Sequence, residues 1–312
     1  MITTFLAILL SAPLTDGDQP DQTGRVIDLI ADYQVNHDKV FKKGFAFFGK
    51  GVEVRESGNS TYVTDRMYLC VYEGPRRRLD ASGTATANNT GRYIERWLQF
   101  LEYDDKKLFR PSMRSDKTED ASTDKWVKEE EEKKSLHFLA VPQPLKNLLI
   151  TYGGLTIWSP PNAPCGTEYL LSNKVEMIEG KNTKDRNIEA SFKHFEPNLP
   201  TVTTIQFGKN DNYLPIDVLH KVKIKGQWIA FSLAEINWEH RSGYSLPAAV
   251  VYTQFGLNKG ASKVQIDVVF DWKLGEQVTR QLNHRLDDWR EPFKELFDAD
   301  WQDSKPFVAS PK

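Results

Sequence analysis

The sequence predicts a mainly β protein of the α+β class, built on antiparallel strands. Aromatic residues make up 12% of the chain, and large rings favour the pleated, half-buried surface of a sheet. Runs that alternate apolar and polar residues recur along the chain, and turns rich in Gly, Asn and Pro separate them. Stretches with helical periodicity stand apart from these runs, most clearly near the two ends.

A helix is predicted over residues 24–36. Thr23 is a residue type that caps helices, because its hydroxyl can accept a hydrogen bond from a free backbone N–H of the first turn. Apolar residues then follow at the spacing of one helical face, at Val26, Leu29, Ile30 and Tyr33. We expect this face to pack on an apolar surface.

Two further helices are predicted. Pro144 opens a short apolar stretch over residues 144–149, and proline suits the first turn of a helix. From Val278 to Leu296, apolar residues recur every three or four positions. This spacing predicts a C-terminal amphipathic helix, which Pro292 should kink or restart.

Strands account for most of the remaining chain. In the first half, residues 45–54, 62–72 and 79–83 predict a meander, and residues 91–101 are typical of another strand or a short helix. Residues 104–134 are rich in charge, Pro and Ser, and predict a charged flexible loop. In the second half, alternation predicts strands over 174–180, 187–195, 201–207, 214–218, 228–238, 246–251 and 264–272.

A short motif occurs twice in the second half. Leu214-Pro215 and Leu246-Pro247 each follow a turn and open a predicted strand. Proline at the start of a strand removes no hydrogen bond from the ladder. The shared arrangement predicts two successive hairpins.

The first residues are similar to an export signal. A short apolar run from Phe5 to Leu10 is followed by a polar stretch, although the usual basic residues before the run are missing. We predict a signal peptide over residues 1–19 and a periplasmic or otherwise exported protein, with a short buried first segment as the alternative. No segment has the roughly 20 apolar residues that a membrane-spanning helix needs. The body is predicted to be one domain over residues 24–275, followed by a helical extension and tail over 276–312.

Charge and cysteine content narrow the function classes. The formal net charge is −2 and the isoelectric point is about 6.3, which argues against a nucleic-acid binder, because phosphate binding needs concentrated positive charge. The chain has two cysteines, Cys70 and Cys165. A disulfide between them is compatible with export, and the alternative for Cys70 is a buried, inert thiol.

No catalytic, metal or cofactor site is apparent in the sequence. The six histidines include no pair four residues apart, so no helix offers two metal ligands on one face. The nucleophile motif GxSxG and the phosphate-binding GK[ST] motif are both missing. The adjacent acids Asp104-Asp105 and Asp287-Asp288 are typical of solvated surfaces. We therefore expect a protein that is not an enzyme and has no cofactor and no metal.

The order of the predicted elements resembles that of the LolA-like lipoprotein-localisation proteins, in particular divergent secreted bacterial members. The resemblance covers roughly residues 24–275 and depends on the export signal, the helix, the meander, the two Leu-Pro openings and the closing Val268-Val269-Phe270-Asp271-Trp272. It implies a curved antiparallel sheet or incomplete β-barrel with helices as a lid, to which the predicted N-terminal and short mid-chain helices correspond. The C-terminal amphipathic helix would be an extension beyond it. The resemblance also implies an apolar concave face that binds acyl chains or a lipidated partner.

The candidate lining of that concave face is aromatic. It consists of Phe45, Phe47, Trp97, Phe100, Trp228 and Trp238. Each of these residues is also typical of an ordinary core, so three functions stay open. The first is a lipid or lipoprotein carrier with a cavity, and the second is an envelope structural or interaction protein with a filled core. The third is a secreted hydrolase with convergent acids or histidines in a cleft.

Overall fold

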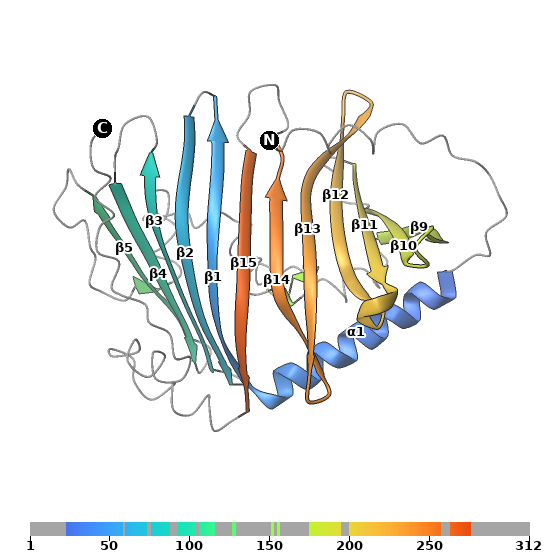
Figure 1. Cartoon of the computed structure of the whole chain (residues 1–312), viewed down its shortest axis with the longest axis horizontal. Helices are drawn as coiled ribbons and strands as arrows, with labels where there is room; N and C mark the ends of the chain where they lie inside the picture. The colour runs from blue at the N-terminus through green and yellow to red at the C-terminus, as the bar shows by residue number, and fades with distance from the viewer. Residues whose placement is uncertain are drawn as a thin grey trace.

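The computed structural model describes residues 23–58, 60–73, 76–87, 93–103, 106–115, 127–128, 151–152, 155–156, 175–194, 200–256 and 263–275. A thirteen-stranded antiparallel sheet dominates these residues, and the long helix α1 (Thr23–Lys43) crosses one half of it near the strand ends (Figure 1). The predicted fold class is confirmed as a mainly β, curved and open antiparallel sheet with an N-terminal helix. The edge strands of the described sheet are β6 and β9.

Strands that follow one another in the chain also lie side by side in the sheet. The first half contains β1 (Phe45–Ser57), β2 (Ser60–Glu73), β3 (Arg76–Ala87), β4 (Tyr93–Tyr103), β5 (Lys106–Ser115) and β6 (Val127–Lys128). The second half contains β9 (Val175–Asn182), β10 (Ile188–His194), β11 (Thr201–Gly208), β12 (Leu214–Ile224), β13 (Gln227–Arg241), β14 (Tyr244–Gln254) and β15 (Lys263–Leu274). The first and last long strands, β1 and β15, pair and join the two halves.

Two small elements accompany the sheet. The strands β7 (Thr151–Tyr152) and β8 (Leu155–Thr156) pair only with each other in the described residues. A single 3₁₀ turn, η1 (Lys209–Asp211), connects β11 to β12.

The predicted N-terminal helix is confirmed, and it is longer than expected. Its buried face continues beyond the predicted end at residue 36 to His37 and Val40. The helix ends at Gly44, whose φ of 75° lies in the left-handed region that glycine adopts without a steric penalty. The Gly44 carbonyl then accepts a hydrogen bond from the Gly275 N–H, which ties the end of α1 to the end of β15.

The first half of the sheet extends further than the sequence predicted. Residues 93–103 form a strand, β4, so the strand alternative for this stretch is correct. The charged loop predicted over 104–134 is wrong in part, because residues 106–115 form β5 and residues 127–128 form β6. Composition favoured a loop here, but pairing with β4 satisfies the backbone of β5 and makes Leu108 and Phe109 register partners of apolar residues on β4.

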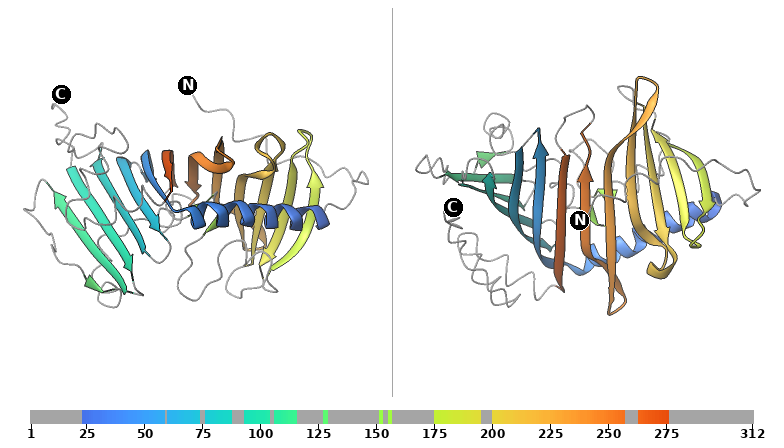
Figure 2. Two further views of the ribbon diagram at one scale, coloured as in Figure 1. Left: turned by 90° about the horizontal axis from the view of Figure 1, so that it is seen from below. Right: turned by 45° about the horizontal axis from the view of Figure 1, so that its top comes forward.

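The two halves of the sheet differ in regularity. The register is unbroken from β15 through β1 to β5. In the second half, register shifts occur at Ser191/Phe192, Gln206/Phe207, His220/Lys221 and Asn237/Trp238. Bulges bend a strand and increase its twist, and the strands of this half curl around α1 (Figure 2).

Several predicted features lie outside the described residues. These are the signal peptide over 1–19, the mid-chain helix over 144–149, the C-terminal helix and tail beyond residue 275, and Cys165 with any disulfide to Cys70. Among the residues that are described, no helix combines the length and the apolar character needed to cross a membrane.

Candidate functional site

The face of the sheet that packs against α1 is called here the inner face. Phe45 and Phe47 are buried in the same core cluster as the apolar residues of α1. Side chains alternate along a strand, so Gly49, Gly51 and Glu53 share this face. Register partners on neighbouring strands share a face of the sheet. The unbroken pairing of β1 with β2 and β15 therefore shows which residues of these strands lie on the inner face.

Aromatic rings fill the inner face where the two halves of the sheet meet. The ring centroids of Phe47 and Trp272 lie 4.8 Å apart, and those of Phe47 and Phe270 lie 5.3 Å apart in an edge-to-face arrangement. Phe45 contacts Trp272 at 5.4 Å. Such pairs add about 0.5–1.5 kcal/mol each to the stability that comes from burial alone. This region is therefore packed core rather than open surface.

Both Leu-Pro motifs lie where one strand separates from the next. β14 pairs with β15 only over residues 249–254, so its first residues leave the ladder. There the Trp272 Nε1–H donates a 2.7 Å hydrogen bond to the Pro247 carbonyl. At the other motif, the Trp238 Nε1–H donates to the Pro215 carbonyl at the same distance. In each case an indole N–H supplies the hydrogen bond that the backbone ladder no longer makes.

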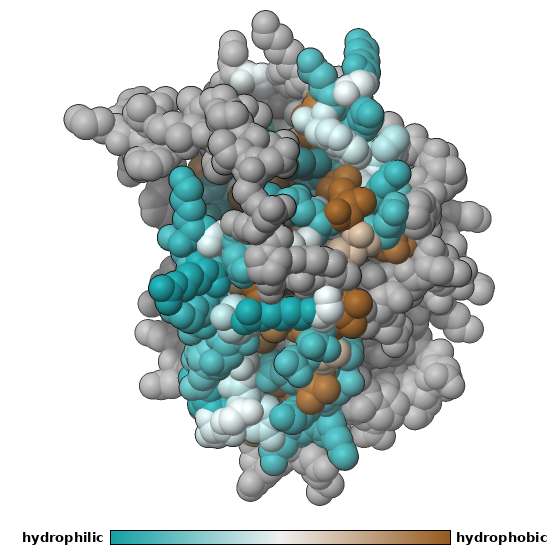
Figure 3. Space-filling view, turned by 90° about the vertical axis from the view of Figure 1, so that its right-hand side faces the viewer, coloured by the Kyte–Doolittle hydropathy of each residue, from teal (hydrophilic) through white to brown (hydrophobic). Residues whose placement is uncertain are grey.

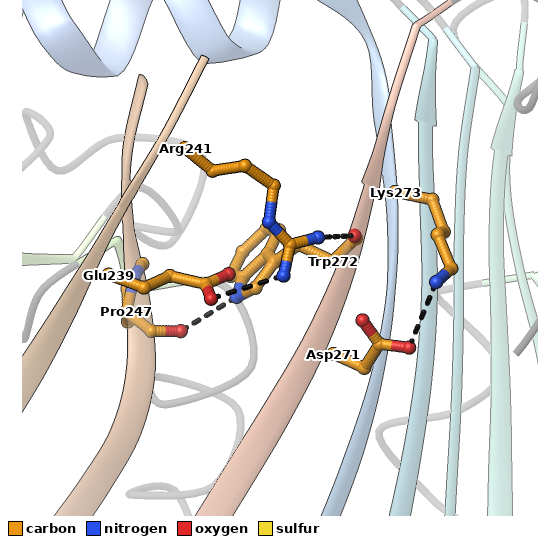
Figure 4. A network of polar contacts seen from close by, with 6 residues as sticks. All are labelled: Glu239, Arg241, Pro247, Asp271, Trp272 and Lys273. Atoms are coloured by element: carbon orange, nitrogen blue, oxygen red, sulfur yellow. Dashed lines mark hydrogen bonds and ion pairs between the residues drawn. The ribbon is translucent and has the colours of Figure 1, made fainter. Parts of the chain in front are cut away.

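A second contact braces the separation between β14 and β15 (Figure 4). The Arg241 Nη1–H donates to the Trp272 carbonyl at 3.1 Å, and its Nη2 lies 3.2 Å from Glu239 Oε2. Asp271 and Lys273 form an ion pair nearby on β15. Near α1 the sheet is thus held by side chains as well as by backbone pairing.

A chain of polar groups crosses the inner face of the second half. The Thr203 hydroxyl lies 2.7 Å from His194 Nε2 and 2.8 Å from His220 Nδ1. Burial lowers the pKa of His220 to about 4, and the nearby His194 adds to this effect. On the next strands, Ser232 hydrogen-bonds to Tyr252. These buried polar groups have hydrogen-bond partners, as a stable interior requires.

Sequence reasoning did not find this chain of polar groups. Thr203 is 9 residues from His194 and 17 residues from His220, so only the strand register brings the three together. A usable signal was present, because Thr203 occupies a core-facing position in an alternating strand.

The inner positions of β3 become small towards its end. Reading every second residue, they are Arg77, Leu79, Ala81, Gly83, Ala85 and Ala87. The intervening positions are polar, from Arg78 and Asp80 to Thr86. Glycine within a strand often marks a place where a ligand or another backbone approaches closely. Four consecutive inner positions of β3, from Ala81 to Ala87, thus carry only glycine and alanine.

The glycines of β1 have a packing reason of their own. A Cβ on Gly49 would come within 3.1 Å of the Phe270 ring. A Cβ on Gly51 would come within 2.3 Å of the Asp267 carbonyl oxygen. These two glycines let β15 pack closely on β1. The run of small inner residues that has no such explanation lies on β3, from Ala81 to Ala87.

The six aromatic residues predicted to line a concave face lie in different surroundings. Phe45, Phe47 and Trp238 are buried in the core, and Trp238 packs edge-on against Tyr33 of α1. Trp228 is exposed near the β12–β13 turn, with the Lys223 ammonium 5.8 Å from its ring.

The remaining two candidates, Trp97 and Phe100, lie on β4. They are three positions apart, which on a strand means opposite faces. The Phe100 position shares the inner-face row of Phe47 through Cys70 and Leu79. Trp97 takes a position on the outer face.

An acidic pair lies on the outer face. Asp217 of β12 and Glu235 of β13 are register partners. Burial, together with the charge of Glu235, raises the pKa of Asp217 to about 6. Within the described residues, no group of three His, Cys, Asp or Glu side chains could hold a metal ion.

Much of the described surface is hydrophilic when seen from the side of β9 and β10, and apolar residues form separate patches on it (Figure 3). Ile178 is the large apolar side chain that β9 exposes. Charged neighbours accompany it, because Lys181 forms ion pairs with Glu179 and Glu189 at 3.2 and 3.1 Å. Charges of this kind protect an edge strand against pairing with other chains.

No family model matches the chain, and a search of curated proteins finds no relative. Solved structures show a distant likeness. A DUF1329 family protein from Desulfovibrio piger has a TM-score of 0.37 at 10% identity, covering 81% of this chain and 93% of its own. A proposed outer membrane lipoprotein-sorting protein domain from Vibrio parahaemolyticus has a TM-score of 0.37 at 7% identity, covering 86% and 97%.

A beta-barrel-like DUF1849 protein from Brucella abortus has a TM-score of 0.28 at 10% identity, covering 75% of this chain and 98% of its own. Identities this low assign the chain to no family.

Proposed function

We propose that this protein is a non-catalytic carrier that binds the acyl chain of a lipid, or of a lipidated partner, on the inner face of β1 to β5. The observation that supports this best is the run of small inner positions on β3. A sheet that only needed a filled core would be expected to carry larger apolar residues at these central positions. Small residues next to apolar rows leave room for an apolar ligand.

The surroundings of this surface suit an acyl chain. On one side lies the row that contains Phe47, Cys70, Leu79 and Phe100 in register. An acyl chain gains about 0.8 kcal/mol for each CH₂ group that it buries, so a long chain binds tightly without directional contacts. Binding of this kind needs no catalytic residue, in keeping with the lack of catalytic motifs in the sequence.

An exported location is part of the proposal. A carrier of acyl chains between membrane surfaces would act outside the cytoplasm, and the apolar run at the N-terminus supports export. Cell fractionation with N-terminal sequencing of the mature chain tests this. A cytoplasmic protein that keeps its first residues would contradict it.

Native mass spectrometry of the protein from its own envelope fraction, followed by lipid extraction, tests acyl binding. We expect a stoichiometric acyl-containing species. A clean mass of the protein alone, with no uptake when palmitate is titrated, would reject the carrier and favour a scaffold with a filled core.

A pair of matched variants locates the binding surface. Ala81→Leu/Ala85→Leu adds bulk on the inner face of β3, and Ser82→Leu/Thr84→Leu adds the same bulk on its outer face. The inner variant should lose most of its acyl uptake, and the outer variant should keep it. Circular dichroism of both variants shows whether the fold is intact. Equal uptake by the two folded variants would place the ligand elsewhere.

A further inference from the structure

The hairpin of β12 and β13 reaches beyond the strands on both of its sides. Its two strands pair with each other as far as Ile224 and Gln227. On one side, the pairing of β11 with β12 ends at Val222. On the other side, the pairing of β14 with β13 begins only at Ser232. Among the described strands, the hairpin tip over residues 224–230 therefore projects from the end of the sheet (Figure 1).

A tight two-residue turn closes the tip. Lys225 and Gly226 both have positive φ angles, of 49° and 84°, as in the type I′ turn of short hairpins. Asn, Asp and Gly are the favoured residues at the first of these positions, and other side chains adopt this conformation at a steric cost. Lysine occupies the position here, and its side chain is exposed.

Positive charge is concentrated at this tip. Lys221 and Lys223 are two residues apart on β12 and share the outer face, and Lys225 follows in the turn. The chain has no acidic residue over positions 218–234, although its overall net charge is −2. The nearest acid on β12 is Asp217, which lies four positions before Lys221. The tip is therefore a basic element on a slightly acidic protein.

An exposed tryptophan accompanies the lysines. Trp228 is the register partner of Lys223 across the hairpin, and the Lys223 ammonium lies 5.8 Å from its ring centroid. The Trp228 side chain is 45% exposed, whereas tryptophan is highly buried on average. Ile224 adds a partly exposed aliphatic side chain at the tip. Apolar surface and positive charge are thus presented together.

This combination matches the chemistry of an anionic membrane surface. Tryptophan is enriched at the boundary between water and hydrocarbon, because its ring is apolar and its N–H is polar. Lysines next to that boundary attract anionic head groups, and their aliphatic stems can lie along apolar surface. A nucleic acid would require basic charge over a larger area than one hairpin tip provides.

We propose that the tip of the β12–β13 hairpin docks on an anionic phospholipid surface. Trp228 enters the interfacial region of the bilayer, and Lys221, Lys223 and Lys225 contact the phosphate-bearing head groups. The inference goes beyond the proposed function, since a carrier with a cavity and a scaffold with a filled core would both dock in this way.

Vesicle flotation with the full chain tests the proposal. One set of vesicles contains equal parts of phosphatidylcholine and phosphatidylglycerol, and the other contains phosphatidylcholine alone. We expect at least about tenfold tighter binding to the anionic vesicles, with the difference reduced at high salt. A protein that does not float with the anionic vesicles would overturn the proposal.

A charge-removing variant locates the contact. Lys221→Gln/Lys223→Gln/Lys225→Asn removes the three charges, and asparagine suits the turn position. Each lysine near an anionic surface strengthens binding about fivefold, so the variant should bind more than about thirtyfold more weakly. Circular dichroism and urea unfolding show whether the variant keeps its fold.

The matched control removes three exposed lysines that lie away from the hairpin tip. Lys184 and Lys209 lie at the opposite end of the sheet, and Lys42 lies at the end of α1. Lys42→Gln/Lys184→Gln/Lys209→Gln makes the same change in net charge and should keep most of the affinity. An equal loss in the two folded variants would overturn the assignment to the hairpin.

Trp228→Phe tests the position of the indole. Anionic vesicles with brominated acyl chains quench tryptophan fluorescence at the bilayer, so the wild-type protein should be quenched more than Trp228→Phe. Equal quenching of the two proteins would overturn the insertion of Trp228. Soluble poly-glutamate carries negative charge without a bilayer, and we expect it to bind far more weakly than the vesicles. Equally tight binding that depends on the three lysines would replace the membrane with an acidic protein partner.

Discussion

The half of the sheet from β9 to β15 lies under α1 and fills its inner face with large side chains, such as Phe207, Ile205 and Trp238. The half from β1 to β5 continues the same sheet in unbroken register, yet its third strand presents mainly glycine and alanine to that face. One backbone architecture thus carries two kinds of inner surface. The contrast lies in the residue types at inner positions, which are large and apolar in one half and include a run of small residues on β3 in the other.

The polar residues at inner-face positions also differ between the two halves. In the second half, Thr203, His194 and His220 hydrogen-bond to one another, so their requirements are met within the chain. In the first half, Arg66 and Arg96 occupy positions of one inner-face row, on either side of Gly83. Polar groups that satisfy one another stabilise a core.

The largest expected effect concerns the filled half. Phe207 is fully buried on β11, and Phe207→Ala should lower the free energy of unfolding by about 3–5 kcal/mol, because it removes apolar contacts and leaves a cavity. Urea unfolding followed by circular dichroism measures this. Trp228→Ala, at an exposed position, is the control and should change stability little. A loss below about 1 kcal/mol for Phe207→Ala would mean that this half is not tightly packed.

The buried histidine predicts a pH dependence. The pKa of His220 in the folded state is about 4, below its ordinary value of 6.5. The unfolded chain therefore binds more protons between these values, and stability falls as the pH drops from 6.5 towards 4. Over this whole pH range, the loss in the free energy of unfolding from His220 is on the order of 3 kcal/mol. Asp217 acts in the opposite direction over part of this range, because its raised pKa stabilises the fold at low pH.

Two variants separate these contributions. Asp217→Asn removes the opposing carboxylate, so stability should depend more steeply on pH between 4 and 6.5. Asp217→Asn/His220→Gln should flatten the curve again, since glutamine does not titrate but can still hydrogen-bond to Thr203. The measurement is urea unfolding at a series of pH values. The same slope in both variants would show that the pKa of His220 is the same in the folded and unfolded states.

A smaller effect compares the two halves directly. Ala234 is a buried inner residue of β13, and Ala234→Leu should cost about 1–3 kcal/mol through overpacking. Ala85→Leu makes the same change at an inner position of β3 and should cost well under about 1 kcal/mol if that surface is open. Thermal unfolding of both variants gives the comparison. Equal losses would indicate that the inner face of β3 is filled like that of β13.

The sequence by itself determined the local elements. The apolar spacing from Val26 to Tyr33 specified α1, and alternation specified most strands of the second half, because side-chain burial repeats every 3.6 residues in a helix and every two in a strand. The resemblance to LolA-like proteins also anticipated a curved, open sheet. Local composition gave a wrong prediction for β5. Its charged sequence predicted a loop, but the segment pairs with β4 as a strand.

The site depended on information that the sequence does not carry locally. Trp97 and Phe100 would share a face on a helix but lie on opposite faces of a strand, and only the fold distinguishes these cases. Arg66 and Arg96 are 30 residues apart in the chain, and two hairpin registers bring them into one row. Register is set by turn geometry and by burial of one whole face. The tertiary structure therefore decided which residues meet, whereas the sequence alone determined which segments are strands and which is the helix.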